Sequence, residues 1–204
     1  MSFDIPSYTP LECSLQDIRP ISFICIQREN PSLMQYFDDL CAENHYLSSK
    51  NPKGNYLSYL VTTQNSNVIA CLMFSQPAWK LKPRESYIGW NEAVKKENLK
   101  HLLNNSRFVI LKDIKIRNLA TYILGQVQKR VSEDWSSLYG EPIYMLETFV
   151  DESRNDGACY KADNWTRIGD MVLQKGNKEL IGRTIGVYLK PLCKNAIRLL
   201  TIDV

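Results

Sequence analysis

Glu147 is the residue whose position in this sequence most requires a partner or a function. It lies in the middle of the β-like run 143–150, where alternation places it on the same face as Phe149. Removing a carboxylate from water costs on the order of several kcal/mol unless the group is paired. Glu147 is therefore predicted to be a catalytic base, a metal ligand or half of an internal ion pair with Arg107 or Lys161.

Three other side chains are candidates for chemistry. Asp151 opens the polar turn after that run and could join Glu147 in acid/base or metal chemistry. Tyr160, in the segment CYKADNW, could act as a general acid or as a nucleophile toward nucleic acid, although a tyrosine among aromatic residues is more often a packing residue. His45 opens a loop and could titrate near neutral pH, whereas a lone histidine is more often structural.

Tryptophans and basic residues alternate through the middle of the chain. Stacking on aromatic rings together with phosphate contacts is what single strands or flipped bases require. The same pattern also fits a helix docked on a sheet, with tryptophans in the core and lysines at the solvated rim. The candidate nucleic-acid-binding residues, three of them from CYKADNW, are Trp79, Lys80, Arg84, Trp90, Asn104, Asn105, Arg107, Lys161, Asn164 and Trp165.

Hydrophobic periodicity predicts the elements that must position these residues. Two β runs, 56–63 and 68–75, are separated by the turn-prone QNSN and predict a hairpin. A β run at 108–111, helix-spaced apolar residues over 119–131 and the run 143–150 predict a strand-helix-strand crossover with parallel strands. The other predicted elements are a β-rich segment at 21–27, helices at 31–41 and 91–103, a short helix between the run 143–150 and the last strand, that strand at 184–189 and a short helix at 193–200.

This order of elements predicts an α/β fold with three layers, in which helices flank a mixed β-sheet. It matches the order of the Gcn5-related N-acetyltransferase (GNAT) fold, although other mixed-sheet folds share part of it. In that fold a glycine-rich turn before the central helix holds the pyrophosphate of the cofactor. Here the turn reads KIRNLAT, so Arg117 and Ala120 stand where a basic and a small residue are expected, but Asn118 replaces glycine. The alternative is an ordinary helix start with Asn118 as its N-cap.

Composition limits the classes of protein to consider. With 204 residues and 44% hydrophobic content, the chain can bury a full core, so we predict an N-terminal arm at 1–30 and one domain at 31–204. A net charge of +3 permits a nucleic-acid partner without requiring one. The six cysteines form no Cys-x-x-Cys pair, and neither histidine lies near two of them, which argues against a structural metal site. The sequence shows neither a signal peptide nor an apolar run near 18 residues, so we expect a cytoplasmic protein with reduced thiols.

Several blocks of the sequence, in order, resemble a known family. They are HYL at 45–47, ACLMFSQPAWK at 70–80, IGW at 88–90, NNSRFVIL at 104–111, NLATYIL at 118–124, DW at 134–135, YGEPIYMLETFVD at 139–151 and GACYKADNW at 157–165. As a set they are similar to the family of DruA, a protein of the Druantia anti-phage system and formerly a bacterial domain of unknown function. The family usually continues with a basic stretch rich in glycine and threonine, where this chain has GDMVLQKGNKELIG.

The resemblance implies a prokaryotic origin and a role in defence against phage or in mobile-element biology. It also implies nucleic acid, DNA above all, as the object acted on and a helicase-type protein as a partner. It supplies no settled reaction, so the cofactor, the oligomeric state and the question of catalysis stay open.

Three functions remain in competition. The first is a protein that binds or acts on DNA through the tryptophan-containing set. The second is an acyl-CoA-dependent N-acyltransferase of GNAT type, with Glu147 as base and Tyr160 as acid. The third is a non-catalytic adaptor that binds a partner protein through the same tryptophans.

Overall fold

The structure is a computed structural model that describes residues 5–26, 29–44, 52–171, 174–175, 178–179 and 184–202. Seven strands are hydrogen-bonded in the order β2-β3-β4-β5-β7-β11-β8. The chain divides into two compact units, and β5 contributes to both. The first unit consists of residues 1–75 and 106–120, and the second consists of residues 76–105 and 121–204. The predicted boundary at residue 30 stays a prediction.

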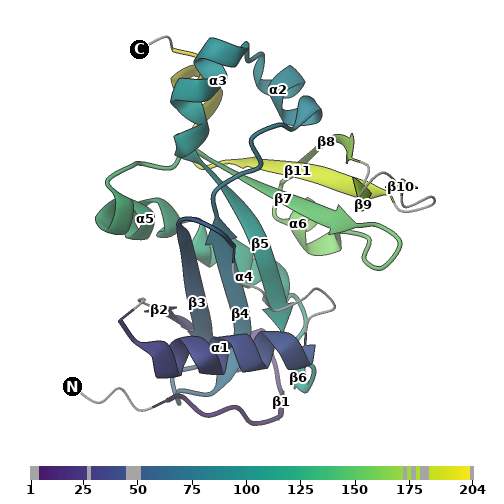
Figure 1. The fold of residues 1–204 in the computed structure, drawn as a ribbon. Coiled ribbons are helices and arrows are strands. Elements are labelled where there is room, and N and C mark those ends of the chain that lie inside the picture. The colour runs from purple at the N-terminus through teal and green to yellow at the C-terminus, as the bar shows by residue number, and fades with distance from the viewer. Residues whose placement is uncertain are drawn as a thin grey trace. The chain divides into compact units, whose positions relative to one another are not determined.

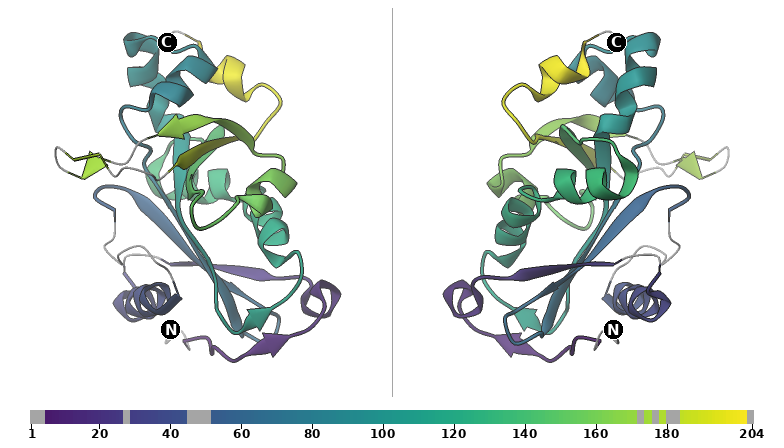
Figure 2. Two further views of the ribbon diagram at one scale, coloured as in Figure 1. Left: turned by 90° about the vertical axis from the view of Figure 1, so that its right-hand side faces the viewer. Right: turned by 90° about the vertical axis from the view of Figure 1, so that its left-hand side faces the viewer.

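The first unit is built on an antiparallel sheet next to a long helix (Figure 1). The predicted hairpin is confirmed, because β3 and β4 pair antiparallel over their full length and are almost wholly buried. The predicted helix at 31–41 is also confirmed and ends three residues later than expected, while β1 runs parallel to β6 (Figure 2). The elements are β1 Leu11–Glu12, a 3-10 turn Leu15–Ile18, β2 Ser22–Ile26, α1 Pro31–Asn44, β3 Tyr56–Thr62, β4 Val68–Ser75, the second half of β5 Leu102–Ile110, and β6 Ile114–Lys115.

The second unit contains the predicted crossover. β5 and β7 are parallel, as predicted, and β11 lies antiparallel between β7 and β8. A separate two-stranded ladder joins β9 and β10. The elements are the first half of β5, α2 Lys82–Ile88, α3 Glu92–Asn98, a 3-10 turn Leu99–His101, most of α4 Leu119–Val127, α5 Val131–Tyr139, β7 Met145–Asp151, α6 Ala158–Ala162, β8 Thr166–Met171, β9 Gln174–Lys175, β10 Lys178–Glu179, β11 Ile185–Pro191 and α7 Ala196–Leu200.

The predicted helix at 91–103 is too long, and the predicted strand at 108–111 is too short. Asn91 caps α3 by accepting a 2.9 Å hydrogen bond from the Val94 amide, but the helix ends at Asn98. Leu102 and Leu103 are fully buried in β5, where they pair with β7. Burial in the sheet has overridden the helical spacing of these leucines.

The helix-spaced residues over 119–131 form two helices instead of one. α4 ends at Val127, and α5 begins at Val131 after a turn closed by the Arg130 amide, which donates to the Val127 carbonyl. The Arg130 side chain then donates to Asp134 in the first turn of α5 at 2.6 Å. α2 and β8 are absent from the sequence-based prediction.

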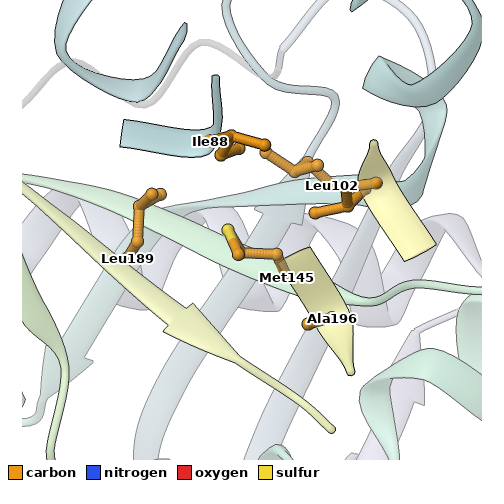
Figure 3. Packing of buried hydrophobic residues seen from close by; sticks show 6 residues of the cluster. Ile88, Leu102, Met145, Leu189 and Ala196 are labelled. Atoms are coloured by element: carbon orange, nitrogen blue, oxygen red, sulfur yellow. The ribbon is translucent and has the colours of Figure 1, made fainter. Parts of the chain in front are cut away.

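One hydrophobic cluster covers a face of the second unit's sheet. Ile88 of α2 points toward Leu102, Met145 and Leu189 of three neighbouring strands (Figure 3). Ala196 and Leu200 of α7 complete the cluster. All of these side chains are buried, so α2 and α7 are packed firmly on the strands that carry the candidate site.

Candidate functional site on the second unit

The sheet of the second unit carries different polar residues on its two faces. The register pairs Asn104 with Glu147 and Glu147 with Leu189, so these three residues lie side by side on one face. One position further along, Thr148 pairs with Tyr188 on the opposite face. We name the first the α2 face and the second the α6 face, after the helices whose side chains contact them.

On the α2 face, Glu147 forms an ion pair with Arg84 of α2. The Arg84 Nη1 atom lies 2.8 Å from Glu147 Oε2, and both side chains are fully buried, with 0% exposure. Burial raises the pKa of Glu147, and the nearby Arg84 charge opposes that rise. Glu147 is thus half of an internal ion pair, one of the three predicted alternatives, but its partner is Arg84 and not Arg107 or Lys161.

The same ion pair holds the backbone of the segment before α2. Arg84 Nη2 donates to the Ala78 carbonyl at 2.8 Å, and the Ala78 amide donates to Glu147 Oε1 at 3.3 Å. Three residues later, the Leu81 amide donates to Glu85 Oε1 at 3.1 Å. We name residues 76–81 the Trp79 loop. Both ends of its central dipeptide, Trp79–Lys80, are therefore fixed by hydrogen bonds to the core of the unit.

A buried lysine supports the loop from the side of α3. Lys95 is 1% exposed, and its ammonium lies 2.6 Å from Glu92 Oε1 and 3.5 Å from Glu85 Oε1. The ammonium also lies 5.3 Å from the centroid of the Trp79 ring, over its face. Lys95 was not among the predicted site residues. The sequence held a signal, because Lys95 stands four residues before the buried Leu99 and so faces inward on the helix.

The structure separates the members of the predicted tryptophan and basic set. Trp79 is 51% exposed, and Lys80 beside it is also exposed. Trp90 is half-buried, donates from Nε1 to the Leu200 carbonyl at 2.6 Å, and has the Arg84 guanidinium 5.7 Å from its ring centroid. Trp79 and Lys80 are thus at the surface, while Arg84 and Trp90 belong to the interior.

On the α6 face, a tyrosine and an asparagine are joined. The Tyr160 hydroxyl donates to Asn105 Oδ1 at 3.0 Å, and the Thr148 hydroxyl donates to the Asn105 carbonyl at 3.0 Å. The Tyr160 ring also packs on Trp165 and Tyr188, with centroids 5.1 and 6.1 Å away. All five residues are buried. The predicted residues Asn105, Tyr160 and Trp165 therefore meet in one interior cluster, on the face opposite Glu147.

The other predicted residues of this unit are dispersed. Asp151 is buried and accepts hydrogen bonds at Oδ1 from the amide and hydroxyl of Ser153, at 3.1 and 2.5 Å, which stabilises the turn after β7. Lys161 and Asn164 are exposed, and Asn164 lies two residues after the end of α6 with a φ of 59°. The side-chain oxygen of Asn104 is buried and has no hydrogen-bond partner among the described residues.

In the first unit, Arg107 is a buried side chain. Its Nη1 donates to the Met73 sulfur at 3.7 Å. The hydrogen bond from Cys71 and, to a smaller extent, the Arg107 charge lower the pKa of Cys41 against the effect of burial. Arg107 thus serves the interior of this unit.

The predicted cofactor residues lie at the beginning of α4. Arg117 and Asn118 are exposed, and Ala120 is half-buried in the first turn. Asn118 has a φ of 61°, the left-handed conformation that glycine adopts most easily and asparagine tolerates best among the other residues. The backbone therefore keeps the conformation of a glycine turn although the glycine is absent.

The remaining predictions concern His45, a metal site and a membrane-spanning helix. His45 lies outside the described residues. Within the described ranges, no group of three or more His, Cys, Asp or Glu side chains is placed to hold a metal ion. In those same ranges, no helix is both long and apolar enough to cross a membrane.

Solved structures with a similar fold are acetyltransferases. NAA60 of Arabidopsis thaliana, in complex with acetyl-CoA, has a TM-score of 0.56 at 11% identity, over 84% of this chain and 98% of that chain. Spermidine N-acetyltransferase of Vibrio cholerae, in complex with CoA and spermine, has a TM-score of 0.53 at 8% identity, over 84% and 95%. The ribosomal-protein-S18-alanine N-acetyltransferase of Escherichia coli has a TM-score of 0.53 at 9% identity, over 84% and 94%. The predicted fold class, a mixed sheet with flanking helices in an acetyltransferase-like order, is therefore confirmed.

The family is shown by the sequence itself. The model of the Druantia protein DruA family matches residues 16–186. The chain belongs to this family, as its motifs predicted. No curated protein sequence matched the chain.

Proposed function

We propose that this DruA-family protein binds nucleic acid, with DNA as the expected target in its anti-phage role, through the Trp79 loop of the second unit. The observation that carries the proposal is the exposure of Trp79, at 51%, on a segment held by a fully buried ion pair. Single exposed apolar side chains are common on protein surfaces, so the Trp79 indole supports the proposal through its fixed position and not through exposure alone. Together with the adjacent Lys80, it offers the ring and the charge that nucleic-acid strands require.

The distribution of charge supports the second unit as the binding part. It contains 17 basic and 14 acidic residues, whereas the first unit contains 8 of each. The net charge of +3 therefore belongs to the unit that carries the Trp79 loop. A local positive surplus attracts the phosphate backbone and speeds its encounter with the protein.

The hydrogen bonds to Ala78 give the loop a fixed conformation before any ligand arrives. A loop that must become ordered on binding loses affinity, because side-chain and backbone freedom are lost. Here Arg84 and Glu147 have already fixed the backbone beside Trp79. The candidate base of the sequence analysis thus acts in the proposal as a positioning residue for the loop.

The test is binding of fluorescein-labelled DNA, single-stranded and double-stranded, over a series of salt concentrations. We expect binding that weakens steeply with salt and falls in Trp79→Ala and Lys80→Ala variants. The matched controls are Leu138→Ala, which removes another exposed apolar side chain, and Lys100→Ala, which removes another exposed lysine of the same unit. Absence of binding at low salt would overturn the proposal and favour a protein partner for Trp79.

A second candidate function, acyl-CoA binding, is favoured by the conformation of Asn118. The left-handed turn at φ 61° leads into α4, where the Leu119 amide already donates to the Ile116 carbonyl at 3.3 Å and the next amides have no partner within the helix. Arg117 and the Ala120 amide would hold the pyrophosphate there, and an acyl-CoA would supply the activated acyl group. The residues fit in conformation and charge, but the Asn118 side chain occupies space that glycine leaves open to a phosphate.

Calorimetric titration with acetyl-CoA tests this second function. If the site is used, Asn118→Gly should bind at least as tightly as the natural chain, because glycine keeps the turn and removes the side chain. Arg117→Ala should bind more weakly, while Lys115→Ala, an exposed lysine two residues away, serves as the control. Absence of heat at high micromolar acetyl-CoA would remove the acyltransferase from consideration.

A further inference from the structure

Only one face of the Trp79 ring is open to a ligand. The Lys95 ammonium lies over the ring at 5.3 Å from its centroid, and two carboxylates, Glu92 and Glu85, hold the ammonium in place. Lys95 is 1% exposed, and its ammonium is already paired with these two carboxylates, so in this conformation it is not available to a phosphate. One face of the Trp79 ring is therefore covered by Lys95, and only the opposite face is open to a ligand.

The loop geometry keeps that face in a constant position. Ala78 precedes Trp79 and is held at both its amide and its carbonyl, and Leu81 is held at its amide. Lys80 and Lys82 on either side of Leu81 are exposed. A flat group attached to a phosphate chain could stack on this fixed aromatic face while its phosphates contact the exposed lysines.

We infer that the Trp79 loop recognises an unpaired nucleobase, which stacks on the open face of Trp79 while Lys80 and Lys82 contact the neighbouring phosphates. The substrate class is thus single-stranded nucleic acid. In a duplex both faces of each base are covered by neighbouring base pairs, so a rigid ring with one open face finds a partner only at ends or distortions. This inference rests on the proposed function and specifies its ligand.

The experiment compares three labelled DNA ligands of equal length at one salt concentration: a single strand, the corresponding duplex with hairpin-closed ends, and a single strand with abasic sites along its length. The abasic strand keeps the phosphate charge and removes the stacking partners. We expect the natural protein to bind the single strand most tightly. Trp79→Ala should weaken that binding about 5- to 150-fold, the equivalent of stacking one base, and should bind the abasic strand as the natural protein does.

Two further variants separate stacking from charge. Trp79→Phe should retain most of the affinity, since the ring face is kept. Lys80→Ala should lower the slope of log affinity against log salt by about 0.7, the value for one phosphate contact on a single strand, whereas Trp79→Ala should leave that slope unchanged. Trp79→Ala also removes the contact with Lys95, about 0.5–1 kcal/mol, so urea unfolding of each variant is measured and should show that all remain folded under the binding conditions.

The outcomes distinguish the inference from the proposed function. Equal affinity for the natural and abasic strands, or for the single strand and the closed duplex, would overturn the inference and leave nucleic-acid binding in place. Binding that Trp79→Ala does not change would overturn the inference and also the role of Trp79 in the proposed function. Failure to bind any of the three ligands at low salt would overturn both.

Discussion

The ion pairs Arg84–Glu147 and Arg167–Glu152 of the second unit have the same chemistry and opposite surroundings. Arg84 and Glu147 are wholly buried, at 0% exposure each, and meet through one close contact of 2.8 Å. Arg167 and Glu152 are 36% and 24% exposed and meet through two, with Nε donating to Oε1 at 2.8 Å and Nη2 donating to Oε2 at 3.0 Å. The better hydrogen-bond geometry is thus found at the surface, where an ion pair contributes least to stability.

The two glutamates respond to these surroundings in opposite directions. Burial raises the pKa of Glu147, with Arg84 only partly compensating. The hydrogen bonds from Arg167 lower the pKa of Glu152, which is hydrated enough to escape most of the cost of burial. In addition, the Arg84 Nε atom has no hydrogen-bond partner among the described residues.

The difference between the two pairs indicates the role of the buried pair, Arg84–Glu147. A buried ion pair rarely stabilises a fold more than well-packed apolar residues would, because desolvation offsets the attraction. What Arg84 and Glu147 contribute, and an apolar pair cannot, is a donor and an acceptor for Ala78. Their role is to place the Trp79 loop.

The largest expected effect comes from breaking the buried pair. Glu147→Gln leaves the buried Arg84 with only a longer contact to the half-buried Glu85, at 3.7 Å, so we expect the free energy of unfolding to fall by about 3–5 kcal/mol. Urea unfolding measures the loss, with Glu152→Gln as the matched control. A loss below about 1 kcal/mol in Glu147→Gln would show that water reaches Arg84 and that the two pairs do not differ as described.

A smaller but more informative effect comes from replacing the buried pair as a whole. The double variant Arg84→Met, Glu147→Leu removes both charges and refills the space, so most of the lost stability should return. Ala78 is itself exposed, so water can take over its hydrogen bonds, but the loop is no longer fixed. We therefore expect near-natural urea unfolding together with weakened binding of single-stranded DNA. Natural affinity in this variant would show that the pair does not position Trp79.

Much of the fold could be predicted from the sequence because its signals are local. The β3–β4 hairpin follows from two apolar runs around QNSN, and the parallel strands of the crossover follow from the change of period between them. The position of β11 between β7 and β8 could not be predicted, because strand order is set by long-range pairing that no local pattern records. The burial of Leu102 and Leu103 in a strand likewise depends on β7, more than forty residues away.

Several residues of the candidate site, Glu147, Arg84 and Trp79 among them, were named from the sequence, but their arrangement was not predicted. The cost of burying Glu147 was visible in the sequence, and so was the alternative of an ion pair. Its partner was missed because α2, which carries Arg84, spans only seven residues. A proline in its first turn and Gly89 at its end, with a φ of 84°, were signals that could have identified this helix. Which of the two tryptophans is exposed could not be predicted, because Trp90 is held by the Leu200 carbonyl, 110 residues away in the sequence.

The exposed pair should show a small effect that depends on salt. Arg167 also contacts Asp170, so Glu152→Gln leaves the arginine with one carboxylate partner. We expect a loss of about 1 kcal/mol or less in the free energy of unfolding, which shrinks further when the salt concentration is raised. Urea unfolding at low and high sodium chloride checks this expectation. A loss comparable to that of Glu147→Gln would show that exposure does not explain the difference between the two pairs.

The smallest effect, a difference in pH dependence, tests the comparison most directly. The pKa of Glu147 lies above the ordinary glutamate value of 4.5, so its contribution to stability is present below pH 4.5 and is lost as the pH rises toward the folded-state value. The pKa of Glu152 lies below 4.5, so its contribution is present above pH 4.5 and is lost as the pH falls toward the folded-state value.

The measurement is the free energy of unfolding of the natural chain minus that of each Gln variant, followed from pH 3.5 to 6.5. For Glu147→Gln the difference should fall as the pH rises above about 4.5, and for Glu152→Gln it should fall as the pH drops below about 4.5. Subtracting each variant removes the titration of every other group, so the sign of each slope reports one carboxyl. Slopes of the same sign would mean that the Arg84 charge fully offsets the effect of burial on the pKa of Glu147. The buried carboxylate would then be stabilised as well as the exposed one.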